Sequence, residues 1–417
     1  MKKRMMSGLD YKYITAGICF IIVLTGLGFC SSAKSMYFAA ITDALGLSRS
    51  AFSINDSCRF ITTAIVNIFF GVMVEKYGTK RLIIAGMLSL IISSMLYSWA
   101  TTLFMFYLGG IFLGIGIAWT TTSMVAVVVN RWFKENKGTV MGIVLASNGL
   151  GAAIAIHIIT PIIYSSPFGY QSAYRLTALI LLAVTFLVVI LYKENPTSIE
   201  TEEGTTEENA DEQSGIEYGE LVKKPYFYAI IAGIFLHMLV SVGGITTPHF
   251  TDIGLSPSFV AATLSLMVIA LAVFKLLSGF IYDHMGIRVS TNICLFSVVI
   301  SKLILLFITN SVSGRVLTVA YCIICGLATP IETVMLPILA LDIFGQKCFN
   351  KVLGIITSVA TIGQTLGTPL LNLFYDYFNS YRSAFLFSAL ISIIVVIIMN
   401  LGMNSSFKEN VRVKTRR

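Results

Sequence analysis

The sequence predicts an all-α membrane protein with twelve transmembrane helices arranged as two parallel six-helix repeats. Three observations lead to this fold class: an apolar composition, long apolar stretches along the whole chain, and a loop motif that occurs twice. Hydrophobic residues make up 56% of the 417 residues and charged residues 12%, whereas soluble domains average about 25% charged residues. The mean hydropathy of +0.83 therefore indicates a chain that lies in a bilayer.

Each apolar stretch has about the length that a helix needs to cross a bilayer, roughly 20 residues. The first stretch is longer than the apolar region of a signal peptide and lacks a small-residue cleavage site, so we expect it to be retained. The expected spans are 12–37, 52–74, 82–101, 104–129, 139–164, 173–193, 226–248, 258–281, 290–310, 315–343, 352–375 and 381–404.

The positive charges lie mainly on one side of these spans. Of 29 Lys and Arg residues, 21 lie at the termini or in loops on the N-terminal side, four lie in opposite loops and four lie inside spans. The positive-inside rule therefore predicts that both termini are cytoplasmic, and we expect a multi-pass protein of a prokaryotic plasma membrane. The net charge of +8 is explained by this bias, so no nucleic-acid partner is expected.

The longest hydrophilic stretch predicts a flexible linker near the middle of the chain. Residues 200–212 are acidic and almost without apolar side chains, which is typical of a flexible segment. We expect an N-terminal six-helix bundle at 1–193, an acidic cytoplasmic linker at 194–224 and a C-terminal six-helix bundle at 225–417. Because six spans precede the linker, both bundles have the same orientation.

A loop motif occurs once in each half. Residues 71–81 read GVMVEKYGTKR, and residues 279–288 read GFIYDHMGIR, 208 residues further on. Three other segments recur in the same order, with Thr42, Gly142 and Ser172 matched to Thr251, Gly354 and Ser383 at offsets of 209, 212 and 211. Four ordered matches indicate a parallel internal repeat, an architecture found in membrane transporters.

The doubled motif, the repeat and the central linker resemble the major facilitator superfamily over nearly the whole chain. The resemblance implies that the acidic residue of the motif latches the cytoplasmic side in one conformation. Glu75 and Asp283 are then the expected gating residues, with Lys80, Arg81 and Arg288 as their basic partners. The alternative is a solvated charged loop.

A second resemblance is narrower. Residues 130–151, which begin NRWFKENKGTVMG, are similar to a segment of the monocarboxylate and oxalate/formate branches. Lys34 matches a lysine that monocarboxylate carriers place in their first span, and Lys275 lies where they carry an arginine four residues before a glycine. Two positions depart from the pattern: Leu271 replaces an aspartate of the carriers, and Gln364 is the nearest polar residue to a lysine of the oxalate exchangers.

Charged side chains inside the spans are candidates for substrate binding, because each costs roughly 2.5–3.5 kcal/mol on insertion scales. Lys275, Arg59 and Lys34 are the candidate anion-binding cations. Asp56 lies three residues before Arg59, on the same helix face, so the two can pair; a structural ion pair is the alternative to binding. Lys302 is expected to snorkel outward or pack between helices.

Polar residues in the inner halves of spans are weaker candidates. Asn148 and Gln364 can hydrogen-bond a substrate, but contacts between helices are the favoured explanation for them. The glycine pairs beginning at Gly149 and Gly363 are expected to allow close helix approach. Cys322 and Cys325 form a CxxC within an apolar run, which favours helix packing over a metal or redox site.

Glu332 is the clearest carboxylate inside a span. It lies between Pro330 and Pro337, which predict a bent helix with freed backbone groups. Burial disfavours a charged carboxylate, so such a glutamate can exchange protons near neutral pH. The alternatives are a fixed counter-ion to Lys275 or Arg59 and an inert protonated side chain.

Four in-span cations against two acids give a net positive interior, which favours an anionic substrate. We therefore expect a secondary transporter of a small organic anion (a monocarboxylate such as lactate, pyruvate or formate, or oxalate) that works by alternating access, coupled to protons or exchanging anions. Multidrug or hydrophobic-solute efflux is the alternative, and a transporter-like nutrient sensor is a third reading. No Walker A pattern is present, and we expect a monomer without enzymatic activity, cofactor or metal.

Overall fold

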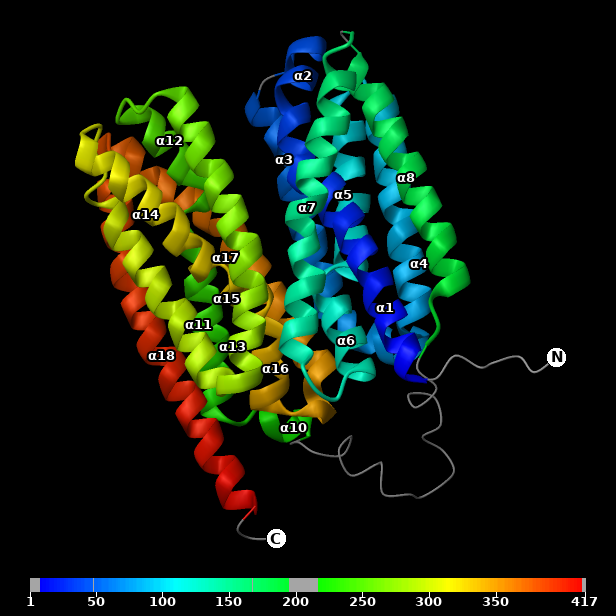
Figure 1. The fold of residues 1–417 in the computed structure, drawn as a ribbon, viewed down its shortest axis with the longest axis vertical. Coiled ribbons are helices and arrows are strands. Elements are labelled where there is room, and N and C mark those ends of the chain that lie inside the picture. The colour runs from blue at the N-terminus through cyan, green and yellow to red at the C-terminus, as the bar shows by residue number, and fades with distance from the viewer. Residues whose placement is uncertain (1–7, 48, 167, 195–216, 415–417) are drawn as a thin grey trace, which may run out of the picture. The chain divides into compact units, whose positions relative to one another are not determined.

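The structure is a computed structural model that describes residues 8–47, 49–166, 168–194 and 217–414 (Figure 1). Every secondary-structure element assigned within these residues is a helix, as predicted. The chain divides into two compact units, Met1–Thr206 and Glu207–Arg417. Most of the expected linker, residues 195–216, lies outside the described residues, so the linker stays a prediction.

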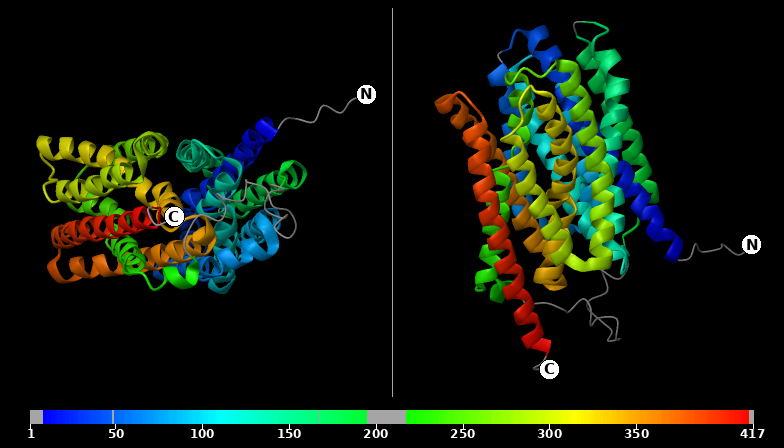
Figure 2. Two further views of the ribbon diagram at one scale, coloured as in Figure 1. Left: turned by 90° about the horizontal axis from the view of Figure 1, so that it is seen from below. Right: turned by 60° about the vertical axis from the view of Figure 1, so that its left-hand side comes forward.

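The first unit consists of long helices that run side by side (Figures 1 and 2). Its first span is not one regular helix, because a π-helix and a 3₁₀ turn interrupt it before Ser35. The elements are α1 (Gly8–Val23), η1 (Leu24–Phe29), η2 (Ser32–Lys34), α2 (Ser35–Leu45), α3 (Arg49–Ile68), α4 (Phe70–Trp99), α5 (Leu103–Thr120), α6 (Thr122–Trp132), α7 (Lys137–Ile163) and α8 (Gly169–Leu191).

The second unit is built in the same way. Its expected tenth span is interrupted twice, after Ala328 and after Thr333, next to the prolines that predict a bend. The elements are α10 (Tyr218–Leu221), α11 (Pro225–Leu239), α12 (Gly243–Asp252), α13 (Pro257–Leu305), α14 (Val312–Ala328), α15 (Pro330–Thr333), α16 (Met335–Phe344), η4 (Gln346–Cys348), α17 (Phe349–Phe378) and α18 (Arg382–Lys414).

The described helices account for the twelve expected spans. Nine helical segments of the described chain are long and apolar enough to cross a membrane. One of the nine, Ala262–Leu305, is 44 residues long and covers two expected spans. The more polar helices α3 and α17, of 20 and 30 residues, supply the other two. The chain is therefore an integral, multi-pass membrane protein.

The doubled motif is helical rather than a loop, which corrects the boundaries expected from sequence. In each copy the helix continues to a single break, at Gly78 (φ 76°, ψ 168°) in α4 and at Gly286 (φ 77°, ψ 174°) in α13. Positive φ is the conformation that glycine adopts without steric cost. The matching angles show that the sequence repeat is also a repeat of backbone geometry.

Glycines bring the backbones of certain helices into direct contact, as expected. A Cβ atom added to Gly151 of α7 would lie 2.1 Å from the Leu24 carbonyl oxygen. One added to Gly367 of α17 would lie 2.3 Å from the Leu239 carbonyl oxygen. In each unit, therefore, a later helix packs against the first expected span of that unit with no room for a side chain.

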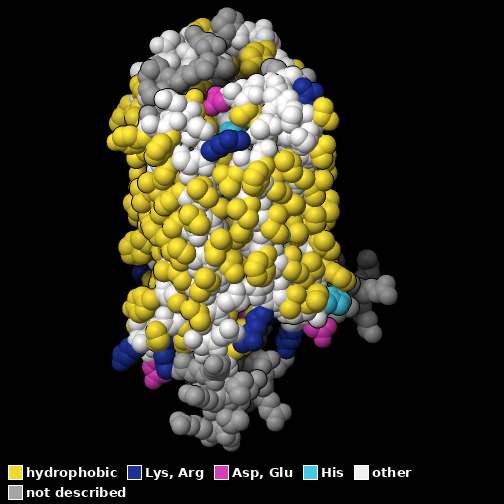
Figure 3. Space-filling model, turned by 90° about the vertical axis from the view of Figure 1, so that its left-hand side faces the viewer, with side chains coloured by type: hydrophobic (Ala, Val, Ile, Leu, Met, Phe, Trp, Pro, Cys, Tyr) yellow, Lys and Arg dark blue, Asp and Glu magenta, His cyan; other side chains and the backbone are white. Residues whose placement is uncertain are grey.

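The outer surface matches a bilayer. Figure 3 shows a broad belt of hydrophobic side chains on one face, with charged side chains at its two ends. Exposed apolar side chains such as Val316 of α14 and Leu390 and Ile397 of α18 would have an unfavourable free energy of hydration in water. In lipid, they are in a matching solvent.

Candidate functional site

In the first unit, two basic side chains approach the carboxylate of a third residue, Asp56. The Lys34 Nζ atom lies 2.9 Å from Asp56 Oδ1, and the Arg59 Nε atom lies 3.4 Å from the same oxygen. The side chains of Lys34 and Arg59 are 11% and 14% exposed, whereas that of Asp56 is 44% exposed. Two buried cations on different helices thus face one partly open carboxylate, and the cluster keeps a net positive charge.

The local fold explains this arrangement. Lys34 ends the 3₁₀ turn that follows the π-helix, so the irregular part of the first span positions its ammonium group. Asp56 and Arg59 lie one turn apart on α3, which places both side chains on one face. A π-helical insertion of this kind is frequently found at functional sites.

Neutral groups complete the cluster, and the sequence analysis did not single them out as binding residues. Arg59 donates to the Ser31 hydroxyl at 3.1 Å. Oriented to satisfy its neighbours, the Asn55 amide donates to the Tyr97 hydroxyl at 2.8 Å and accepts from Lys34 at 3.1 Å. The Lys34 ammonium also lies 5.6 Å from the centre of the Tyr97 ring, within range of a cation–π interaction.

The two predicted polar residues have different surroundings. Asn148 of α7 is half-buried and accepts a hydrogen bond of 2.9 Å from Ser32. This contact links α7 to the turn that carries Lys34. Gln364 of α17 is exposed within the second unit.

A second cluster of ionisable groups lies inside the second unit. His237 Nε2 of α11 lies 3.4 Å from Glu332 Oε1 of α15, and the Glu332 side chain is 25% exposed. Lys275 of α13 is only 3% exposed. No carboxylate of the described residues lies within ion-pair distance of Lys275, although Glu332 acts on it electrostatically. Glu332 is thus in contact with a histidine rather than with a lysine.

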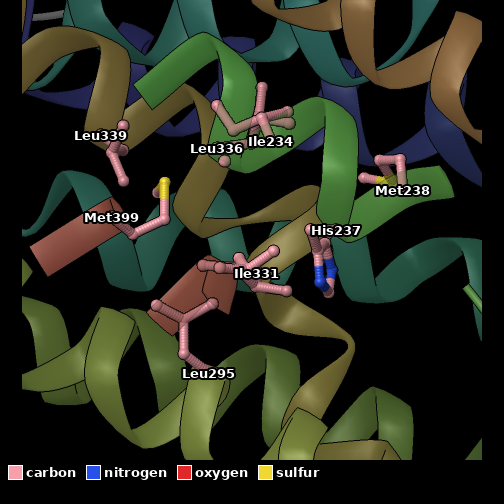
Figure 4. Close-up of a pocket in the computed structure, with 10 residues that line it drawn as sticks. Ile234, His237, Met238, Leu295, Ile331, Leu336, Leu339 and Met399 are labelled. Carbon is pink, nitrogen blue, oxygen red and sulfur yellow. The ribbon is translucent and has the colours of Figure 1, made fainter. Parts of the chain in front are cut away.

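Apart from Glu332, the surroundings of His237 are apolar. Figure 4 shows its ring beside Ile331 and Met238, at the edge of a cavity otherwise lined by aliphatic and methionine side chains. The cavity has room for about 20 Å³, close to the space that one water molecule needs. Neither ring nitrogen of His237 has a hydrogen-bond partner within the described part of the chain.

Lys302 does not snorkel to the surface, which corrects one of the two expectations for it. The side chain is buried, and its ammonium donates to Ser392 Oγ of α18 at 2.7 Å. The other expectation, packing between helices, is confirmed. Glu332 also acts electrostatically on this lysine.

The first copy of the doubled motif is joined to the end of α8. Glu75 and Arg81 are exposed, and Lys80 donates to the Val189 carbonyl oxygen at 3.1 Å. The Glu194 carboxylate accepts hydrogen bonds from the backbone N–H and the hydroxyl of Thr79. Glu194 therefore caps the helix that restarts after the Gly78 break, a role that the linker assignment missed.

The second copy has different contacts. Asp283 is half-buried, and the preceding Tyr282 donates to Asp342 Oδ1 of α16 at 2.9 Å. The Arg288 guanidinium lies 4.2 Å from the centre of the Phe407 ring of α18. The motif thus connects α13 to α16 and α18, and Asp342 is a residue for which the sequence offered no signal.

Two repeated units of apolar helices, with charged clusters inside them, define a multi-pass membrane protein. Residues 17–347 and 250–414 match the profile described as Major Facilitator Superfamily. The chain belongs to the Major Facilitator Superfamily.

Curated relatives carry several transport functions. The chain is 22% identical over 180 residues to the uncharacterized MFS-type transporter YcxA and 25% identical over 260 residues to Multidrug resistance protein 2, both of Bacillus subtilis (strain 168). These alignments cover 42% and 61% of this chain but only 43% and 62% of those relatives. Monocarboxylate transporter 13 of Bos taurus is 24% identical over 69% of this chain and 65% of its own length.

Solved structures share the fold at low identity. The proton:xylose symporter XylE matches with a TM-score of 0.77 at 13% identity, over 94% of this chain and 96% of that one. The transporter FucP in its outward conformation matches with a TM-score of 0.70 at 15% identity, over 94% and 99% of the two chains. These likenesses show the fold and leave the substrate to be inferred from the site.

Proposed function

We propose that this protein is a secondary transporter of a small organic anion, such as lactate, pyruvate, formate or oxalate, that works by alternating access. One observation carries the proposal: the two buried cations Lys34 and Arg59 converge on a single carboxylate oxygen of Asp56. The protein thereby binds a carboxylate of its own in the way that it would bind a substrate carboxylate. Charge-assisted hydrogen bonds to carboxylates are the strong ones in such sites.

The exposure of Asp56 allows a substrate to exchange with its carboxylate. Its carboxylate is 44% exposed whereas both cations are largely buried, so an incoming anion can reach the cations from the open side. We assign Lys34 and Arg59 as substrate-binding residues, with Asn148 positioned through Ser32. This assignment rests on geometry within the first unit.

The second unit supports the same substrate class. Lys275 is buried without an ion-pair partner among the described carboxylates, and an intramembrane cation of this kind is by default a functional residue. We propose that Lys275 binds substrate carboxylate and that the exposed Gln364 hydrogen-bonds the substrate.

Proton coupling is proposed for Glu332. Its carboxylate faces His237 at 3.4 Å, next to an apolar cavity, where a change in its protonation alters the charge balance around Lys275 and Lys302. Because the carboxylate is partly exposed, protons can reach it. A fixed counter-ion role is the alternative, and the pH-gradient experiment below separates the two.

The proposed gating residues lie in the doubled motif. Glu75 and Asp283 are the acidic members, and Lys80, Arg81 and Arg288 are the basic ones. We propose that they stabilise one conformation at the cytoplasmic side, together with the bonds of Glu194 and Tyr282 to neighbouring helices. A prokaryotic plasma membrane, cytoplasmic termini and a monomeric state are part of this proposal.

Uptake into proteoliposomes tests the substrate class. Purified protein is given radiolabelled mono- and dicarboxylates, with and without an inward proton gradient, and sugars and organic cations serve as comparison substrates. We expect uptake of at least one carboxylate, competition by its analogues, and loss of uptake in Lys34→Gln. Transport of cations or sugars with no carboxylate moved or competing would refute the anion assignment.

Efflux of a drug or hydrophobic solute is the second candidate. The named relatives Multidrug resistance protein 2 and Fujikurins efflux protein favour it. Because a drug pump needs a roomy apolar site, it would tolerate Lys34→Gln. Drug resistance conferred on a sensitive host, and retained in that variant, would support efflux over anion transport.

A further inference from the structure

The second unit contains a polar cavity that the proposed transport mechanism does not use. It has a volume of about 350 Å³, within the range of small-ligand pockets. Its walls come from the end of α12, the segments that follow α13 and α17, and the first residue of α18. The residues on which the argument depends are His249, Asp252, Asn310, Tyr375, Tyr381 and Arg382.

Opposite charges line this cavity without neutralising each other directly. Asp252 and Arg382 are both exposed, and both act electrostatically on the His249 ring. No ion pair joins Asp252 to Arg382 among the residues that the structure describes. A cavity with separated charges is complementary to a ligand that carries one charge of each sign.

His249 supplies an unused hydrogen-bonding group. The residue is 4% exposed, and its Nε2 atom has no hydrogen-bond partner in the described chain. The edge-to-face contact of its ring with Phe385, with centroids 4.8 Å apart, fixes its orientation. Buried polar atoms are almost always bonded in folded proteins, so this nitrogen is suited to a bound group.

Aromatic rings form another part of the wall. Tyr375 and Tyr381 stack with centroids 4.6 Å apart, and the Tyr381 hydroxyl donates to Asn372 at 3.1 Å. Ring faces attract ammonium groups, most strongly at desolvated sites. The stacked tyrosines and Asp252 thus favour a ligand with an amine.

The cavity lies where α12 ends and α18 begins, at one end of the helices of the second unit. Figure 3 shows an acidic, a histidine and a basic side chain together at one end of the molecule, directly above the hydrophobic belt. The lining residues place the cavity at the end of the unit where Arg382, predicted to be extracytoplasmic, begins α18. A ligand anchored in the belt by acyl chains would present its headgroup at this height.

We propose that this cavity binds the zwitterionic headgroup of an aminophospholipid, with its ammonium at Asp252 and the tyrosines and its phosphate at Arg382 and His249. A free molecule with the same two charges, such as O-phosphoethanolamine, offers the same chemistry without the acyl chains. The bilayer source is favoured because the cavity adjoins the hydrophobic belt. The proposal is independent of which solute the protein transports.

Native mass spectrometry of the purified protein tests this inference. Protein in detergent is titrated with phosphatidylethanolamine, phosphatidylglycerol or phosphatidylcholine of identical acyl chains. We expect at least threefold more phosphatidylethanolamine adduct than either of the other two. Arg382→Gln and Asp252→Asn should each remove this preference, and Arg175→Gln, an arginine of the first unit on the same predicted side, should keep it.

Two further measurements keep the result decisive. Thermal unfolding of each variant shows that it is folded, and His249→Phe removes the polar nitrogen while keeping an aromatic ring. Equal adducts of all three lipids, or a preference that survives the Arg382 and Asp252 changes, would overturn the site. If free O-phosphoethanolamine raises the midpoint of thermal unfolding but the protein shows no preference among the lipids, the ligand does not come from the bilayer.

Discussion

Replacing Asp56 by Asn tests whether a substrate carboxylate takes the place of the protein's own. The change keeps the shape of the side chain and removes the charge that faces Lys34 at 2.9 Å and Arg59 at 3.4 Å. If the substrate displaces Asp56, part of its binding free energy is used to break this contact. Removing the competing charge should therefore tighten substrate binding.

The expected magnitude follows from the exposure of the pair. Exposed ion pairs contribute about 0.2–1 kcal/mol, and breaking a buried pair costs about 3–5 kcal/mol. Because Asp56 is 44% exposed, we expect its interaction energy to lie between these two ranges and closer to that of exposed pairs. We take about 1.4 kcal/mol, which corresponds to a tenfold change in an equilibrium constant. The half-saturating concentration for carboxylate uptake should fall about tenfold in Asp56→Asn.

Initial rates of uptake in proteoliposomes measure this change. Glu217→Gln is the matched control, because it removes an acid from an exposed ion pair with Lys347 and should leave uptake unchanged. The double variant Lys34→Gln, Asp56→Asn should lack carboxylate uptake, as expected for Lys34→Gln alone, since removing the competing acid cannot replace a cation that binds the substrate. A half-saturating concentration that is unchanged or raised in a folded Asp56→Asn protein would refute the reasoning.

Three more predictions concern the second unit. Lys275→Gln should abolish carboxylate uptake with normal expression and thermal stability, and unchanged uptake would remove this residue from the site. Glu332→Gln should lose stimulation by an inward proton gradient but keep counterflow of the anion, whereas unaltered pH dependence would rule out proton coupling there. Gly367→Ala should lower the midpoint of thermal unfolding, since its Cβ would lie 2.3 Å from a backbone oxygen and overpacking costs about 1–3 kcal/mol; an unchanged midpoint would show that α17 can shift.

The fold could be predicted because its signals are local and repeated. Apolar length fixes the spans, and the two motif copies fix their pairing into halves. The prolines beside Glu332 marked the interrupted helix. The boundaries within the motif were wrong, because helical geometry continues up to Gly78 and Gly286 and a single positive φ replaces the expected loop.

The candidate site was only partly predictable. The cost of charge in a membrane singled out Lys34, Arg59 and Lys275. The contacts of such residues depend on tertiary packing: Lys34 meets Asp56 from a different segment of the chain, and Glu332 meets His237 from a different helix. A single sequence carries no signal for such pairings, since neither partner is close to the other along the chain.

The backbone contact between the first span and α7 has a consequence for measuring the transport cycle. With the Leu24 carbonyl in contact with Gly151 and no side chain between them, we expect these two segments to move as one body. A pair of spectroscopic labels, one on each segment, would keep a fixed separation whichever way the protein faces. Such a pair would serve as an internal distance standard against which any change elsewhere in the cycle can be calibrated.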